Sequence, residues 1–384
     1  MNRMYLLLVV SVFLLACARK PQNISISKNY SQQDIVNIIV KVNDNWQKNN
    51  SYKGRAFWDH SAYHTGNLAA YEITKLEKYK NYSLAWANHN NWKGAMSDNK
   101  NLWKYSYGES PEYVLFGDWQ SCFQTYIDLF NLSEKKDSFM IARSIEVMEY
   151  QMRTENNDYW WWADGLFMVM PVMVKLYHIT GKNLYLDKLY QYYKYAHSIM
   201  YDEETGLFYR DGRYVYPKHK TTNGKKDFWA RGEGWVFAGL AKTIQDLPDT
   251  YKHKNKFIEI YRKMAVTLKK TQQSEGYWTR SLLDPEYAPG PETSGTAFFT
   301  YGFLSGINNG CLNKEEYMPV VDKSWKYLTE VALQKDGGIG YVQPIGERAI
   351  PGQHVDENST ANFGVGAFLL AASEVFKFLE NSKN

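Results

Sequence analysis

The chain has 384 residues, with 45 Lys and Arg against 41 Asp and Glu, which gives a formal net charge of +4. Basic and acidic residues are interleaved rather than grouped in long blocks, which argues against nucleic-acid binding. A small anionic substrate remains compatible, because one or two arginines suffice to bind it. The 31 Tyr and 13 Trp are typical of surfaces that hold sugar rings, although aromatic side chains also pack between helices.

The first residues resemble the signal of a bacterial lipoprotein. Arg3 precedes an apolar run that ends at Leu15 and is too short to span a bilayer as a helix. In signals of this kind, the cysteine at the place of Cys17 is lipidated and becomes the new N-terminus; an uncleaved anchor is the alternative. We therefore expect removal of residues 1–16, a tether over 17–30, and a protein lipid-anchored in the bacterial cell envelope, in the periplasm or at the outer membrane.

After the tether, amphipathic segments alternate with more apolar ones. Ser31 and Asp34 form a capping-box pattern at the start of the first amphipathic segment. The periodicity predicts amphipathic helices at 31–48, 79–92, 137–154, 183–200, 254–273 and 314–333. More apolar helices are predicted to start near Tyr63, Cys122, Asp164, Glu233, Gly295 and Gly364. These starts are roughly 40–70 residues apart, as a repeated helix pair with a long loop requires.

Six helices of each kind predict an all-α fold, an (α/α)6 barrel of six helical hairpins. The apolar helices bury all their faces if they form an inner ring and the amphipathic helices cover it. Parallel inner helices direct their N-termini to one shared mouth. Short β-strands are expected in the loops there, for instance within 207–215. No Pro- or Ser-rich linker follows residue 31, so 31–384 is predicted to be one catalytic domain.

Two cysteines lie within this domain, Cys122 and Cys311. The predicted helices place Cys122 near the start of one inner helix and Cys311 beyond the end of another. At ~1.5 Å per helical residue, parallel helices would separate the two thiols by about 20 Å. We expect no disulfide bond.

The stretch 158–168 combines three consecutive tryptophans with Asp164 at the start of an inner helix. One helix face cannot bury three adjacent indoles, so at least one should face a cavity or solvent. Burial among rings raises the pKa of Asp164 and the helix N-terminus lowers it, so this carboxyl group could donate a proton near neutral pH. Asp118 precedes another inner helix, and two acids at one mouth tend to differ in pKa. Either aspartate could instead be a simple helix cap.

Other candidates for binding lie in the same predicted loops. Arg231, between Trp229 and Trp235, suits a carboxylate clamp or, alternatively, an ion pair with Glu233. Arg210 could reach the pocket or pair with its neighbour Asp211. His64 could bind substrate hydroxyls or be structural. The sequence contains no metal-ligand spacing, no phosphate-binding glycine loop and no nucleophile elbow, so no cofactor and no metal are expected.

Several motifs occur in an order that is familiar from one enzyme group. They are Trp162-Ala-Asp-Gly-Leu-Phe-Met168, Thr180-Gly181, Asp202-Glu-Glu-Thr-Gly-Leu-Phe-Tyr209, Trp229-Ala-Arg-Gly-Glu-Gly-Trp235, Glu292-Thr-Ser-Gly-Thr-Ala297 and Gly364-Val-Gly-Ala-Phe-Leu-Leu370. Over about residues 35–380 the chain resembles the unsaturated glucuronyl and rhamnogalacturonyl hydrolases of glycoside hydrolase families 88 and 105, closer to 105. The fold of that group is the (α/α)6 barrel.

The resemblance implies a substrate and a reaction. The substrate is an acidic oligosaccharide whose non-reducing end is a 4,5-unsaturated uronic acid, the product of a polysaccharide lyase. The acid matched by Asp164 protonates C4 of the double bond and helps water to add at C5, and Asp118 resembles the second family aspartate. Trp229, Arg231 and Trp235 match a substrate-holding loop, and Tyr63 and Trp162 are expected to stack on the sugar.

Two departures leave the sugar specificity open. Arg210 stands where histidine is expected in the enzymes that act on pectin fragments, and Glu233 stands where asparagine is expected. Two other functions also remain as alternatives. A non-catalytic surface glycan-binding lipoprotein would keep the aromatic mouth without the chemistry. An (α/α)6 sugar epimerase would need several histidines at the mouth, where these loops offer only His64. The oligomeric state is left open.

Overall fold

A computed structural model describes residues 25–382 of the chain. The predicted signal segment 1–16 and the lipidation site Cys17 lie outside the described residues. The last part of the predicted tether is structured, because Ile26–Asn29 form the short helix α1. The Ile26 side chain is fully buried, and its backbone N–H donates a hydrogen bond to Asp322 at 2.8 Å. Packing therefore begins before Ser31.

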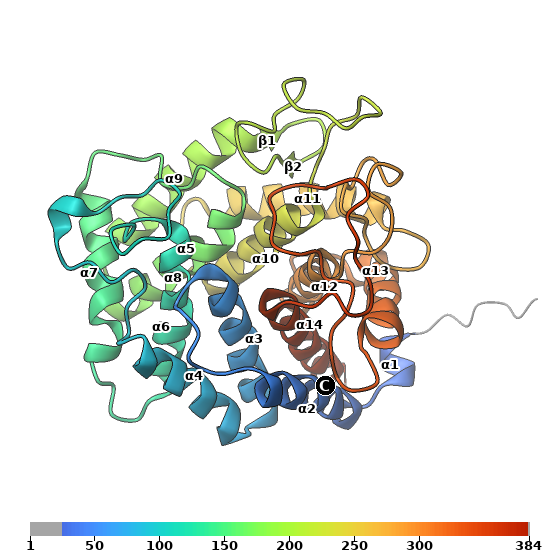
Figure 1. Cartoon of the computed structure of the whole chain (residues 1–384), viewed down its shortest axis with the longest axis horizontal. Helices are drawn as coiled ribbons and strands as arrows, with labels where there is room; N and C mark the ends of the chain where they lie inside the picture. Colours follow the sequence, from blue (N-terminus) through green and yellow to red (C-terminus); the bar gives the residue numbers. More distant parts are fainter. Residues whose placement is uncertain (1–24, 383–384) are drawn as a thin grey trace, which may run out of the picture.

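Within the described part, six apolar helices form a closed inner ring, as predicted for an (α/α)6 barrel. They are α3 (Trp58–Thr74), α6 (Cys122–Leu132), α8 (Asp164–Thr180), α10 (Ala230–Asp246), α12 (Thr293–Asn308) and α14 (Asn362–Asn381). Each packs against the next in chain order, and α14 packs against α3 to close the ring. In Figure 1 the last inner helix, in red, accordingly lies beside the first, in blue.

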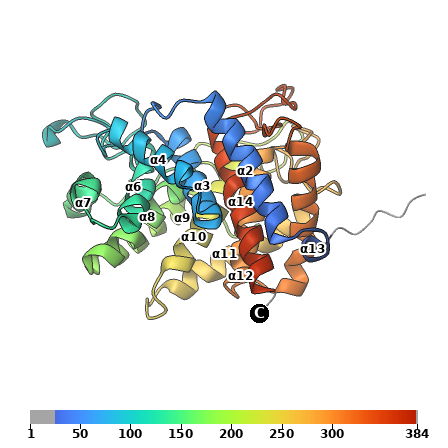
Figure 2. The ribbon, with the colours of Figure 1, turned by 90° about the horizontal axis from the view of Figure 1, so that it is seen from below.

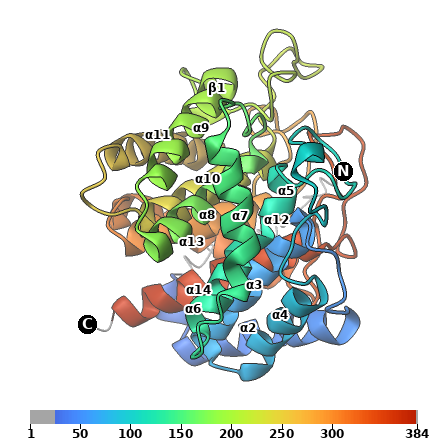
Figure 3. The ribbon, with the colours of Figure 1, turned by 90° about the vertical axis from the view of Figure 1, so that its left-hand side faces the viewer.

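Amphipathic helices cover this ring on the outside. They are α2 (Gln32–Asn49), α4 (Glu77–His89), α7 (Phe139–Arg153), α9 (Leu184–Met200), α11 (Lys254–Thr271) and α13 (Lys314–Tyr327). Each precedes or follows its inner partner in the chain, and α2 packs across α14 and α3 (Figure 2). Figure 3 faces the side that α7 and α9 cover. The fold class and the helix count agree with the sequence prediction.

The ring closes tightly where α3 meets α14. A Cβ atom at Gly66 would lie 2.2 Å from the backbone oxygen of Gly366, so only glycine allows this approach. Among residues 25–382, α14 is the one helix long and apolar enough to cross a membrane by length and composition. Since 83% of its apolar window is buried inside the protein, α14 has the environment of an inner barrel helix.

The remaining elements are short and lie in the loops. They are α5 (Gly117–Gln120), the 3-10 helix η1 (Lys100–Leu102), the π-helix η2 (Leu328–Ala332), β1 (Tyr201–Asp202) and β2 (Leu207–Phe208). The two strands pair antiparallel, so the strand expected over 207–215 is reduced to its first two residues. The inner helix expected near Tyr63 begins at Trp58. Cys122 and Cys311 are free thiols.

Candidate active site

The starts of inner helices α3 and α8, the short helix α5 and the loops at the same end of the barrel line a cavity of about 470 Å³. Both candidate acids, Asp118 from α5 and Asp164 from α8, line it. Its other lining residues are Arg55, Trp58, Tyr107, Glu109, Trp161, Trp162, Arg210, Arg213, Ile345, Gly346 and Glu347. A volume of this size is typical of small-ligand sites, which hold roughly 300–1,000 Å³. The barrel therefore brings four carboxyl groups, three arginines and several aromatic rings to one mouth.

Burial dominates the electrostatics of both acids. Burial raises the pKa of Asp118 well above its usual value, and the nearby charge of Asp164 raises it further. Burial also raises the pKa of Asp164, but the guanidinium of Arg210 partly offsets this effect. As expected from the sequence, two acids thus share one mouth with unequal surroundings. In the described structure, Oδ2 of Asp164 is buried and has no hydrogen-bond partner.

Arg210 lies beside Asp164 rather than away from the cavity. Its Nε is 3.7 Å from Oδ2 of Asp164, and this Nε is also buried without a hydrogen-bond partner among residues 25–382. The guanidinium also pairs with Asp211 at 2.6 Å and lies 5.8 Å from the ring centre of Trp161. The sequence left open whether Arg210 reaches the pocket or pairs with Asp211, and in the structure it does both. Neither Nε of Arg210 nor Oδ2 of Asp164 has a hydrogen bond in the described structure, so a polar ligand group in the cavity can bond them.

Of the three consecutive tryptophans, the middle one faces the cavity. Trp160 and Trp162 are each 1% exposed, whereas Trp161 is only half-buried. Trp162 touches the cavity but is packed so closely that a Cβ at Gly117 would lie 3.0 Å from its ring. The prediction that at least one indole faces a cavity is confirmed. The ring best placed to stack on a sugar is Trp161.

The sequence motif that matches a substrate-holding loop does not line the catalytic cavity at Trp229, Arg231 or Trp235. Trp235 is fully buried between inner helices, and the Trp229 indole N–H donates to Gln343. Arg231 is also fully buried. Its guanidinium donates to the backbone oxygens of Gln343 at 2.6 Å and Pro344 at 2.9 Å. Its acidic neighbour is Glu292, at 3.9 Å, instead of the adjacent Glu233. These contacts hold the loop that supplies Ile345–Glu347 to the cavity.

Tyr63 and His64 lie in α3 and line a neighbouring cavity rather than this one. The Tyr63 hydroxyl donates to Asn43 at 2.7 Å. The His64 ring stacks on Trp86 at 3.9 Å and bonds Ser83 through Nδ1 at 2.9 Å. Neither residue therefore reaches Asp118 or Asp164.

Several cavity residues were not singled out from the sequence. Arg55 pairs closely with Glu109, and Tyr107 donates to the same carboxylate. Arg213 and Glu347 form an ion pair at 2.8 Å. All of these residues lie in long loops without hydrophobic periodicity, so no sequence pattern marked them. Their charge and spacing were the available signals.

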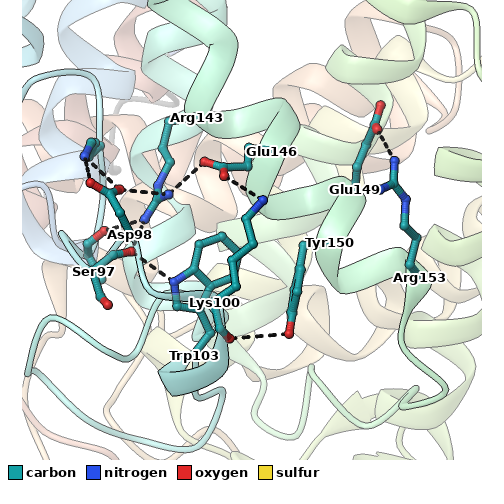
Figure 4. Close-up of polar contacts among 11 residues, drawn as sticks. Ser97, Asp98, Lys100, Trp103, Arg143, Glu146, Glu149, Tyr150 and Arg153 are labelled. Atoms are coloured by element: carbon teal, nitrogen blue, oxygen red, sulfur yellow. Dashed lines mark hydrogen bonds and ion pairs between the residues drawn. The ribbon is translucent and has the colours of Figure 1, made fainter.

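One of these loops, residues 91–116, supplies Tyr107 and Glu109 and leads directly into Asp118. It is anchored to α7 by Arg143, which is 7% exposed and donates to the Ser97 backbone oxygen at 2.5 Å (Figure 4). The same guanidinium lies 4.9 Å from the ring centre of Trp103. Arg143, which does not line the catalytic cavity, therefore anchors the loop that leads to Asp118.

Among residues 25–382, no group of three or more His, Cys, Asp or Glu side chains could hold a metal ion.

The sequence model of the family described as Glycosyl Hydrolase Family 88 matches residues 28–379. A relative from Formosa agariphila, named "Unsaturated 3S-rhamnoglycuronyl hydrolase", is 35% identical over 84% of this chain and 85% of its own length. Solved structures that belong or are thought to belong to family 105 share only the fold, with TM-scores of 0.68 to 0.73 at 16–22% identity.

Two solved structures are more similar. One, named "Polysaccharide Lyase BACCELL_00875", is 65% identical with a TM-score of 0.88, and the match covers 91% of this chain and 99% of that one. The other, a family 88 glycosyl hydrolase from Bacteroides vulgatus, is 57% identical with a TM-score of 0.89, covering 91% of this chain and all of that one. On the match over 28–379, this chain belongs to glycosyl hydrolase family 88.

Proposed function

We propose that Asp164 and Asp118 perform the reaction of this glycoside hydrolase, which removes a 4,5-unsaturated uronic acid from the non-reducing end of an oligosaccharide. The observation that carries the residue assignment is the pair of buried carboxyl groups at one mouth, with raised pKa values and different neighbours. Relatives named unsaturated 3S-rhamnoglycuronyl hydrolases, 35% and 39% identical, support the substrate class, although the second match spans only 51% of that relative.

In the proposed reaction, protonated Asp164 transfers its proton to C4 of the enol-ether double bond. Positive charge develops at C5, next to the ring oxygen, and water adds there while the Asp164 carboxylate accepts a proton from the water. The net change is H on C4 and OH on C5. The resulting hemiketal opens and releases the shortened sugar. The glycosidic carbon is not attacked, which distinguishes this reaction from the usual two-carboxylate displacement.

Arg210 and Trp161 are proposed to hold the uronic acid. The unpartnered Nε of Arg210 is free to donate to the substrate carboxylate, and Trp161 offers a half-buried ring face. A substrate carboxylate that pairs with Arg210 offsets the positive charge next to Asp164. This raises the pKa of Asp164 and favours its protonated form. Asp118, which burial keeps protonated more readily, is proposed to orient the water or the double bond.

The other expected residues take supporting roles in this proposal. Arg231, Trp229 and Trp235 shape the wall behind the loop at Ile345–Glu347. Hydration requires only a proton and water, so we propose no cofactor.

We also propose that lipidation at Cys17 anchors the protein in the bacterial cell envelope. The lipoprotein-like signal supports this anchor, and incorporation of a radioactive fatty acid into the chain but not into Cys17→Ser tests it.

The conjugated enol carboxylate absorbs in the ultraviolet, and this signal disappears when the double bond is hydrated. Asp164→Asn should lower kcat by about 10²–10⁴-fold with binding largely kept, because it removes the proton donor and leaves the shape of the side chain. The measurement is loss of absorbance from lyase digests of several polysaccharides. Asp249→Asn, which changes a surface carboxylate, is the control. Near-normal turnover by Asp164→Asn would remove the catalytic assignment.

A lyase is the second candidate, favoured by the name of the relative that is 65% identical. Elimination creates the double bond that hydration consumes, so the two activities change the absorbance in opposite directions. An increase in absorbance with intact polysaccharide, and no decrease with the lyase digest, would replace the hydrolase by the lyase.

A further inference from the structure

A second cavity, of about 480 Å³, adjoins the catalytic one. Ile345 lines both cavities, and its side chain is 64% exposed between them. The second cavity lies between the end of α2, the first turns of α3 and the start of α14, so it opens at the same end of the barrel as the two acids. A chain of sugars held at the acids can therefore continue over Ile345.

The walls of the second cavity combine aromatic rings with hydrogen-bonding groups. Trp46 and Tyr82 are half-buried, and the His64 ring stacks on Tyr82 at 5.7 Å. His64 is 98% buried, since its exposed fraction is 2%, and it uses Nδ1 to bond Ser83. In the described part of the chain its Nε2 has no hydrogen-bond partner. An unpartnered nitrogen on an otherwise buried ring in a cavity wall points to a ligand or a water that it bonds.

The charge of this cavity differs from that of the catalytic one. Asp118, Asp164, Glu109 and Glu347 all line the catalytic cavity, whereas no carboxylate from residues 25–382 lines the second cavity. Its one lysine or arginine is Lys53, among the residues that the structure describes. Burial lowers the pKa of His64 well below its usual value, so its ring is neutral. Aromatic faces with neutral donors and acceptors are typical of sites for uncharged sugars.

We propose that the second cavity binds an uncharged third sugar unit of the oligosaccharide, the second unit on the leaving side, with its ring against Tyr82 and Trp46. This inference rests on the proposed function, because it assumes that the unsaturated uronic acid occupies the catalytic cavity. It predicts that the protein prefers oligosaccharides longer than a disaccharide. The catalytic cavity, at about 470 Å³, is large enough to hold both rings of a disaccharide, so only the third unit reaches the second cavity.

The test compares unsaturated di-, tri- and tetrasaccharides in which uncharged sugars follow the uronic acid. The native protein should show a kcat/KM about tenfold higher for the longest substrate than for the disaccharide, as one stacked ring provides. Ser51→Trp places a large side chain at the cavity wall from an exposed position. It should abolish this preference through KM and leave the disaccharide unchanged. Tyr82→Ala should weaken the preference in the same direction.

Ser198→Trp, an equally large change at an exposed position of the outer helix α9, is the matched control and should keep the preference. Unchanged disaccharide turnover shows that each variant is folded. Equal kcat/KM for all lengths in the native protein, or an equal loss for all lengths in Ser51→Trp, would overturn the second site while the hydrolase stands. Absence of disaccharide turnover in the native protein would instead contradict the proposed function itself.

Discussion

Arg210 is shared by three carboxylates at the catalytic mouth. It pairs with Asp211 at 2.6 Å, lies 3.4 Å from Glu347 and 3.7 Å from Asp164. A substrate carboxylate that enters must therefore compete with groups of the protein for the same guanidinium. Because burial raises the pKa of Asp164 and Arg210 opposes this rise, the arginine also adjusts the acid that donates the proton.

Arg210→Gln should separate these two roles. Removing the positive charge raises the pKa of Asp164 further, so the acid stays protonated to higher pH. The alkaline limb of the kcat profile should consequently move to higher pH, and KM should rise by about ten- to a hundredfold with the loss of a charged hydrogen bond. Arg210→Lys keeps the charge and should leave the limb in place. A profile that does not move in Arg210→Gln would show that the arginine does not act on Asp164.

The sequence indicated which residue types gather at the mouth, but not which of their faces reach it. Asp118 and Asp164 were predicted correctly as cavity neighbours because their places before inner helices follow from the helix order. For Arg210 the sequence left the pocket and Asp211 as equal alternatives. Arg231 was expected to hold the substrate, yet its guanidinium binds the backbone at Gln343 and Pro344. That loop lies more than a hundred positions further along the chain. No local sequence pattern around Arg231 indicates that this distant loop packs against its guanidinium.

At the scale of elements, the helices follow from periodicity and the loops do not. The predicted helix at 183–200 is α9, which spans Leu184–Met200, because an apolar stripe determines both its length and its buried face. The loop 91–116 has no such stripe. Polar contacts to α7 contribute to its path, among them those of Arg143 to Ser97 and Asp98.

Arg143→Met tests whether this anchor positions the active site. The substitution keeps much of the side-chain volume. It leaves the Trp103 indole N–H as the remaining donor to the Ser97 backbone oxygen and removes the ion pair with Asp98, which should together cost about 1–3 kcal/mol of stability. The looser loop should raise KM through Tyr107 and Glu109 more than it changes the pH profile. Calorimetry and substrate kinetics measure the two effects. Arg153→Met, on the same helix, is the control, since Arg153 is 75% exposed and pairs only at the surface (Figure 4). Similar losses in both variants would argue against a positioning role.

At the scale of the whole molecule, the barrel separates two kinds of environment. The helix N-termini meet at the mouth, where the protein places acids whose pKa values burial raises. The opposite ends of the inner helices meet around Lys175, which pairs with Asp128 at 2.5 Å. Lysines at helix C-termini are favourable with the helix dipole, whereas buried acids are stable mainly when protonated. Burial in the closed barrel thus favours the protonated, neutral form of some carboxyl groups.

Glu233 is the clearest group of that kind outside the cavity. It is fully buried, its Oε1 accepts a hydrogen bond from the Phe208 N–H at 2.8 Å, and its Oε2 has no partner within residues 25–382. Burial raises the pKa of Glu233 well above its usual value. The folded protein therefore keeps a proton that the unfolded chain releases above about pH 4.3. Stability contributed by the protonated form is complete below that pH and is lost as the pH rises toward the folded pKa.

Glu233→Gln should remove this pH dependence, because the amide is uncharged at every pH and its oxygen can still accept from Phe208. Relative to the native protein, the melting temperature of the variant should rise more at about pH 8 than at about pH 5. Thermal unfolding at both pH values measures this difference, with Glu286→Gln at an exposed position as the control. Asp118 acts in the same direction but remains in both proteins, so it cancels in the comparison. A stability difference that is the same at both pH values would mean that Glu233 is already ionised in the folded protein.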